Sequence, residues 1–192
     1  MDTITASFLL IVPLLLMSLS PKKLKKFVVV TLKYYFLIVL LVLIYIENAT
    51  FPFVAQYDVR PNYLFVEYLE YPQEVFSMLL ADYKLALLIA FGMMTAFGYI
   101  YLKKLSYGFS AIFETRYSTR LLLFIPLLLI LFIGVRSSFG HRGANISDAM
   151  YSSNRMLNEI TKNSLHSILY AVYVNKKHGS DNLIKQYGKM DV

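Results

Sequence analysis

The sequence predicts an all-α membrane protein with about four transmembrane helices, short amphipathic surface helices in one outer loop, and an extracytoplasmic helical tail. The first observation is composition: hydrophobic residues are 57% and charged residues 16% of the 192 residues, and the mean hydropathy is +0.54. Such a chain is too apolar for an ordinary soluble domain. The second is that the apolar residues form four long runs. The third is that basic residues flank these runs, so the net charge of +7 indicates membrane topology rather than nucleic-acid binding.

The predicted transmembrane domain covers residues 1–135, and its first two spans cover residues about 4–19 and about 27–46. The first span is short, because its residues make about 24 Å of helix against a hydrocarbon core of about 30 Å. We therefore expect neighbouring helices to pack around it or the bilayer to thin. A basic loop that contains Lys22, Lys23, Lys25 and Lys26 joins the two spans.

The predicted outer loop, residues 47–83, is acidic, with six carboxylates and a single basic residue, Arg60. Pro61 and Asn62 predict a helix start, and apolar residues recur at helical spacing on both sides of Pro72. The carboxylates line another face of each helix. We therefore predict two short amphipathic helices that lie on the membrane surface.

Spans three and four are predicted at residues about 84–102 and about 121–135. Segment 21–33 has five lysines and segment 103–120 has four basic residues, whereas the outer loop has one. The positive-inside rule then puts both basic segments on the cytoplasmic side, and the amino terminus, the outer loop and the tail on the extracytoplasmic side. No ionisable residue lies near the middle of a span, which weakens a transporter function.

Residues 136–192 form the predicted juxtamembrane segment, which contains one helix at about 154–177 with an apolar face. Ser153 or Asn154 is suited to cap its start. Arg155, Glu159 and Lys162 exclude a fifth span, since three charges would lie in hydrocarbon.

Arg136, His141 and Arg142 form a basic cluster directly after span four. Two interpretations are open: an anchor for the span at head-group level, or a pocket for an anionic lipid head group. Arg60 is a further head-group candidate, because arginine donates two parallel hydrogen bonds to phosphate. Glu47, at the end of span two, is the candidate for a structural ion pair with Arg60.

The sequence contains no recognisable catalytic or metal-binding pattern. The chain has no cysteine, and the spacing of His141, His166 and His178 does not bring two of them onto one helix face. We therefore predict no catalytic residue, no metal site and no cofactor within this chain.

Two stretches resemble the lipoteichoic acid synthase family, bacterial phosphoglycerol transferases with a sulfatase-like catalytic domain of the alkaline phosphatase superfamily. Residues 47–75 contain the patterns R-x-N-x-x-F-x-E-Y-L and P-x-E-V. Residues 136–172, RSSFGHRGANISDAMYSSNRMLNEITKNSLHSILYAV, are similar to the stretch before the family's catalytic domain. Members usually have five spans, and the opening residues resemble the family's second span, so the first has no counterpart here.

The resemblance implies the membrane-anchor region of a transferase that acts on lipid head groups, of phosphoglycerol or phosphoethanolamine type, at the outer face of the bacterial cytoplasmic membrane. In that family the nucleophile and a divalent metal (manganese, magnesium or zinc) belong to the following catalytic domain, so this chain is expected to be non-catalytic. The expected partners are membrane lipids, with anionic phospholipid as the candidate, and not nucleic acid. The alternative is a non-enzymatic lipid-binding or regulatory membrane protein.

Overall fold

The computed structural model describes residues 1–68, 71–105, 108–138 and 140–178, and within these ranges the chain is helical and contains no strand. Four helices are long and apolar enough to cross a membrane. They are α1 (Asp2–Leu19), α2 (Lys25–Tyr57), α5 (Lys84–Ile100) with the helical turns that follow it, and α6 (Tyr117–Arg136). The predicted fold class, an all-α membrane protein with four spans, is confirmed.

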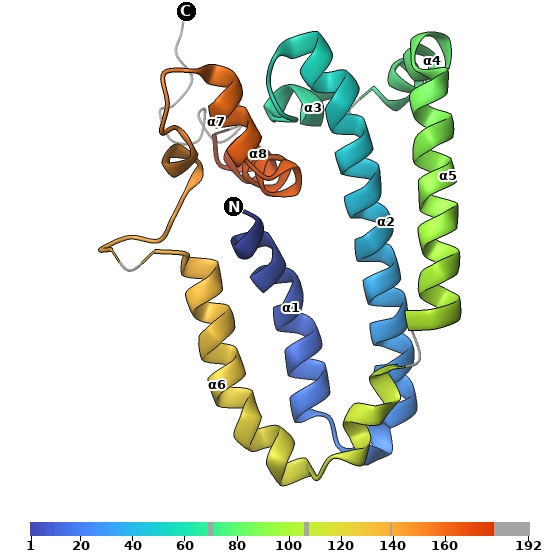
Figure 1. Cartoon of the computed structure of the whole chain (residues 1–192), viewed down its shortest axis with the longest axis vertical. Helices are drawn as coiled ribbons and strands as arrows, with labels where there is room; N and C mark the ends of the chain where they lie inside the picture. Colours follow the sequence, from blue (N-terminus) through green and yellow to red (C-terminus); the bar gives the residue numbers. More distant parts are fainter. Residues whose placement is uncertain (69–70, 106–107, 139, 179–192) are drawn as a thin grey trace, which may run out of the picture.

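The four long helices lie side by side in the order α6, α1, α2, α5 (Figure 1). The helix α1 packs mainly on α6, and α2 packs mainly on α5. The loop at 20–24 and residues 101–105 and 108–116 lie at one end, which we call the inner end (Figure 1). The amino terminus and residues 58–68, 71–83 and 140–178 lie at the other, which we call the outer end (Figure 1). Both basic segments therefore share one end of the bundle.

The two helix pairs are joined at the inner end by a small apolar core. Val28 and Leu32 of α2 are buried against Phe113, which belongs to the 3-10 helix η3 (Gly108–Glu114). The rings of Phe36 and Phe109 stack beside this core with centroids 5.4 Å apart. Short helical turns flank it: η1 (Lys22–Leu24) precedes α2, and a π-helical turn, η2 (Tyr101–Leu105), follows α5.

The helix α2 continues well past the end predicted for span two. Residues 47–57 were expected to be loop, but they are helical despite Pro52. The extension has protein to pack against, since Thr50 and Phe53 are buried and the Phe53 ring meets Phe65 edge-on at 5.8 Å. It ends at Asp58, whose left-handed backbone (φ 55°) suits an aspartate.

The helix α6 begins earlier than predicted, at Tyr117, so that Arg120 belongs to this helix. We assigned this residue to a basic loop, yet its side chain is only 5% exposed. Its Nη1 donates to the carbonyl of Met17 at 2.7 Å, and its guanidinium group lies 4.7 Å from the centre of the Phe113 ring. Arg120 therefore fastens α6 to α1 and η3 at the inner end, and local hydrophobicity gave no sign of that role.

The outer end carries the shorter helices. Residues Tyr63–Tyr68 form α3 and Pro72–Asp82 form α4, where two short helices were predicted. In the tail, η4 (Ile146–Ala149) precedes α7 (Arg155–Thr161) and α8 (Ser164–His178). The single tail helix that we predicted is thus broken at residues 162–163. Asn154 does cap its start, because its side chain accepts a hydrogen bond from the Met156 amide.

Candidate functional site: a polar junction at the outer end

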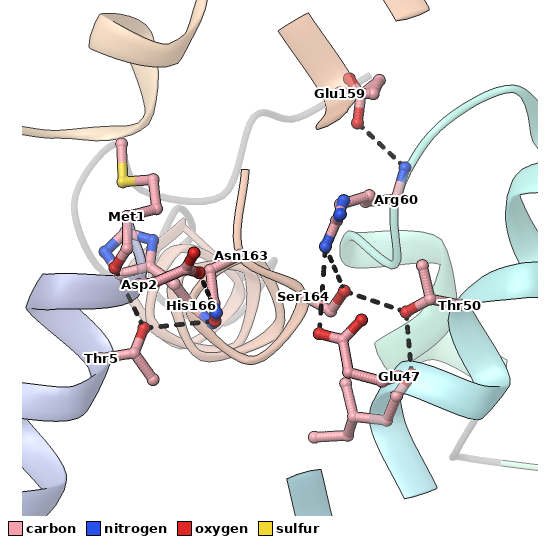
Figure 2. Close-up of polar contacts among 11 residues, drawn as sticks. Met1, Asp2, Thr5, Glu47, Thr50, Arg60, Glu159, Asn163, Ser164 and His166 are labelled. Atoms are coloured by element: carbon pink, nitrogen blue, oxygen red, sulfur yellow. Dashed lines mark hydrogen bonds and ion pairs between the residues drawn. The ribbon is translucent and has the colours of Figure 1, made fainter. Parts of the chain in front are cut away.

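The break between α7 and α8 lies where the tail meets the transmembrane helices (Figure 2). Two consecutive residues at the break contact two different spans: Asn163 bonds to α1 and Ser164 bonds to α2. We call this cluster the outer polar junction. Its members are Asp2, Thr5, Glu47, Thr50, Arg60, Glu159, Lys162, Asn163 and Ser164.

Asn163 serves both as the amino-terminal cap of α8 and as the link to α1. Its Oδ1 accepts from the His166 amide at 2.9 Å, which starts the helix, and from the Thr5 hydroxyl at 3.2 Å. Its Nδ2 donates to Asp2 Oδ1 at 2.7 Å. One amide side chain therefore both breaks the tail helix and ties it to α1.

Ser164, which is 0% exposed, is the link to α2. Arg60 Nη1 donates to its Oγ at 2.8 Å, and its Oγ lies 3.0 Å from Thr50 Oγ1. Thr50 has one hydroxyl hydrogen, and the Ile46 carbonyl, at 2.8 Å, can only accept it. Ser164 must then donate to Thr50, so the bonds run in one direction from Arg60 through Ser164 and Thr50 to the backbone of α2.

Four of the charged groups of the junction form two pairs, Glu159 with Lys162 and Arg60 with Glu47. Glu159, 7% exposed, accepts from the Arg60 amide at 2.9 Å and from Lys162 Nζ at 2.5 Å. Arg60 Nη1 also lies 3.9 Å from Glu47 Oε1. Burial of a carboxylate is tolerable only with such partners. The predicted ion-pair candidates, Arg60 and Glu47, are thus neighbours at the outer end of α2.

Beside the junction is a cavity of about 450 Å³, which we call the junction cavity. The segment 59–63 and α3 form one side of it, and the tail forms the other. Its lining includes Arg60, Asn62, Tyr63, Glu67, Ser167 and Tyr170. Its size is in the usual range for a small-molecule site.

The depth of the junction follows from the length of α2. Counting from Lys25, Glu47 lies about 33 Å along the helix at about 1.5 Å per residue. The hydrocarbon core of a bilayer is about 30 Å thick, and the head-group layers lie directly outside it. If the inner end of α2 starts at one surface, the junction and its cavity lie at the level of the opposite head groups.

The other head-group candidates lie elsewhere. Arg142 and His141 line a second, open cavity in the loop after α6. Arg136 is turned to the loop backbone: its Nε donates to the Ser138 carbonyl at 3.0 Å and its Nη2 to the carbonyls of Gly140 and His141. This loop and the segment 58–62 lie on opposite sides of the α7–α8 hairpin (Figure 1). Arg60 and Arg142 therefore line different cavities, and the head-group candidates do not form one site.

His166 follows the junction by one turn of α8 and points toward the start of α1 (Figure 2). Its Nδ1 is buried without a hydrogen-bond partner among the described residues. Burial lowers the pKa of His166 from its ordinary value, and the positive charge of the amino terminus adds to the effect. The neutral imidazole is therefore the form that suits the docked tail.

Among the described residues, no group of three or more His, Cys, Asp or Glu side chains is placed to hold a metal ion.

Sequence patterns did not identify Asn163, Ser164 or Ser167 as site residues. An asparagine followed by a serine is a common helix start, so the sequence carried a weak signal for the break at residues 163–164. The apolar face that continues through these residues hid this signal, because it suggested one unbroken helix.

No protein-family model matches this chain, and no solved structure matches it. The resemblance to the lipoteichoic acid synthase family stays a prediction that rests on the two stretches quoted above.

Proposed function

We propose that this chain is the membrane region of a lipoteichoic acid synthase-like transferase, and that it anchors and orients the transferase without performing the chemistry. The substrate class is a lipid head group of phosphoglycerol or phosphoethanolamine type at the outer face of the bacterial cytoplasmic membrane. The tail would then leave the bundle on the extracytoplasmic side.

One observation carries the proposal: the two stretches that resemble the family meet in space. Arg60 comes from the first stretch, and its partners Glu159 and Ser164 come from the second. The R-x-N-x-x-F-x-E pattern contributes Arg60, Asn62 and Glu67 to the lining of the junction cavity. Two independent matches that form one site support a shared function better than two matches on unrelated surfaces.

The junction also supports an orienting role. Because Asn163 is bonded to α1 and Ser164 to α2, the start of α8 is fixed against two transmembrane helices. A domain joined to such a hairpin has fewer orientations relative to the bilayer than one on a flexible linker.

The test is the coding sequence downstream of Val192. The proposal expects a frame that encodes a Thr or Ser nucleophile together with Asp, Glu and His metal ligands. It also expects the purified 192-residue chain to transfer no radiolabelled head group between lipids. Head-group transfer by the purified chain alone, or a downstream sequence without nucleophile and metal ligands, would contradict it.

A second candidate is a non-enzymatic lipid-binding or regulatory membrane protein, which the junction cavity itself favours because it does not depend on a following domain. The same downstream sequence distinguishes the two. Lipid binding by the chain together with no catalytic frame would support the second candidate.

A further inference from the structure

The lining of the junction cavity carries both signs of charge. Arg60 and Lys162 contribute positive charge, and Glu67 and Glu159 contribute negative charge. Glu159 is neutralised by Lys162, whereas Glu67 is exposed and has no ion-pair partner among the described residues. A purely anionic ligand would meet this free carboxylate at a cost, since like charges in a partly buried site repel each other.

One residue of the cavity lining has a buried hydroxyl group without a partner among the described residues. Ser167 is 8% exposed, lines the cavity, and its Oγ has no hydrogen bond among the described residues. A buried polar group left unpaired costs about 1 to 3 kcal/mol, so its presence needs an explanation. A ligand with an acceptor atom at this position supplies one.

Ser167 and Arg60 line the same cavity, and Ser167 is close in sequence to the serine that Arg60 contacts. It follows Ser164 by three residues on α8, which puts the two side chains on one face about 5 to 6 Å apart. Arg60 Nη1 bonds to Ser164 Oγ, and the described residues provide no hydrogen bond to its Nε or Nη2. The edge of the Arg60 guanidinium group that carries Nε and Nη2, together with the Ser167 hydroxyl, suits a phosphate group.

The remaining part of the lining suits a cation. Tyr63 and Glu67 are four residues apart on α3 and therefore share a face. Tyr63 and Tyr170, from α3 and α8, bring two aromatic rings to the same cavity. Aromatic faces and a carboxylate are the groups that bind ammonium ions.

We infer that the junction cavity binds a zwitterionic phospholipid head group, with its phosphate at Arg60 and Ser167 and its ammonium group at Glu67, Tyr63 and Tyr170. This inference deepens the proposed function, because it selects an amine-bearing head group over the purely anionic type. With the inner end of α2 at one membrane surface, the cavity lies at the level of the opposite head groups, where a lipid can reach it from the bilayer.

The test measures binding of two short-chain lipids that differ only in the head group, dihexanoyl phosphatidylethanolamine and dihexanoyl phosphatidylglycerol. The full 192-residue chain in detergent is titrated with each, and bound lipid is counted by native mass spectrometry. We expect the ethanolamine lipid to bind about tenfold more tightly, which corresponds to one charge-assisted contact. Equal binding, or tighter binding of the glycerol lipid, would overturn the inference.

Two variants test which residues bind the phosphate and which bind the ammonium group of the ligand. Glu67→Gln keeps the size of the side chain and should remove the preference between the lipids. Ser167→Ala should weaken both lipids about equally, by about tenfold. The matched control is Glu74→Gln on α4, a carboxylate that does not line the cavity. A preference that survives Glu67→Gln would contradict the assignment, and so would a preference that is lost in Glu74→Gln.

Ser167→Ala also separates a binding role from a structural one. Removal of an unpaired buried hydroxyl should leave the lipid-free chain as stable or more stable, while lipid affinity falls. A loss of stability in the lipid-free chain would instead make Ser167 a structural residue. This binding test uses the chain alone, so its failure leaves the downstream-sequence test of the proposed function unaffected.

Discussion

Arg60 donates a hydrogen bond from Nη1 to the buried Oγ of Ser164, across 2.8 Å of space and 104 residues of sequence. This bond joins the loop after α2 to the start of α8. Since Ser164 in turn meets Thr50, three segments of the outer end depend on one hydroxyl group.

Ser164→Ala should therefore loosen the tail. The change leaves Arg60 and Thr50 without a shared partner, which should lower the free energy of unfolding by about 1 to 3 kcal/mol. Hydrogen exchange of α8 amides and thermal unfolding in detergent measure the loss. Ser77→Ala on α4, where the exposed hydroxyl bonds only to the Gln73 carbonyl, is the control and should change little. Equal effects of the two variants would refute the importance of the junction.

Gly134 of α6 should tolerate no larger residue. A Cβ atom at Gly134 would overlap Ser7 Oγ and would lie 3.1 Å from Ser7 Cβ. Gly134→Ala should therefore force α1 and α6 apart and cost about 1 to 3 kcal/mol, as overpacking does. Thermal unfolding in detergent measures the cost.

Gly92→Ala provides the control, because nothing lies within 4 Å of a Cβ there. Adding Ser7→Gly to Gly134→Ala should restore part of the lost stability, since it removes the overlapping atoms. No recovery in the double variant would show that the two residues do not meet.

His166 should make the docking of the tail sensitive to acid. Its pKa in the folded chain is lowered, chiefly by burial, so the folded state takes up a proton less readily than the unfolded state. Its stabilising contribution is fully present above the ordinary histidine pKa of about 6.5 and is lost as the pH falls from there toward the lowered value.

The measurement is the thermal midpoint of the chain in detergent between about pH 7.5 and pH 5, a window that contains the ordinary histidine pKa. His166→Gln should flatten the pH dependence in this window, and His141→Gln, in the loop after α6, is the matched control. A pH dependence that persists unchanged in His166→Gln would assign it to another group.

Labelling can determine which side each end of the bundle faces. The chain has no cysteine, so single cysteines can be introduced without background. We expect a membrane-impermeant maleimide, added to intact cells, to label Gln56→Cys near the outer end of α2 but not Lys23→Cys in the inner loop. The expected outer-side labelling also includes Gln186 in the tail, a position outside the described residues. Labelling of Lys23→Cys from outside would reverse the topology.

Arg136 and Arg142 should behave differently although both belong to the basic cluster after span four. Arg136→Ala removes three hydrogen bonds to loop carbonyls and should make residues 137–143 more sensitive to protease. Arg142→Ala should leave the loop folded. Retention of anionic lipid in Arg142→Ala, measured by native mass spectrometry, then distinguishes an anchor, which keeps the lipid, from a head-group site, which loses it.

The sequence by itself determined the membrane architecture. Four apolar runs are long enough to form helices across a bilayer, and in hydrocarbon a helix satisfies its own backbone hydrogen bonds whatever its neighbours are. Asn154 was identified as a cap for the same reason, because a cap depends on residues within one turn. The alternation of basic and acidic segments likewise matches the two ends of the bundle.

Only the tertiary structure decided where α2 ends, why the tail breaks, and which polar groups meet. The extension of α2 past Ile46 is supported by Phe65 and Ser164, and the break before Ser164 is supported by Thr5 and Asp2. These partners are far away in sequence, so no local pattern of hydropathy or spacing can report them. The burial of Arg120 and the separation of Arg60 from Arg136 have the same cause. The position of a charged side chain depends on the partners that folding brings close to it.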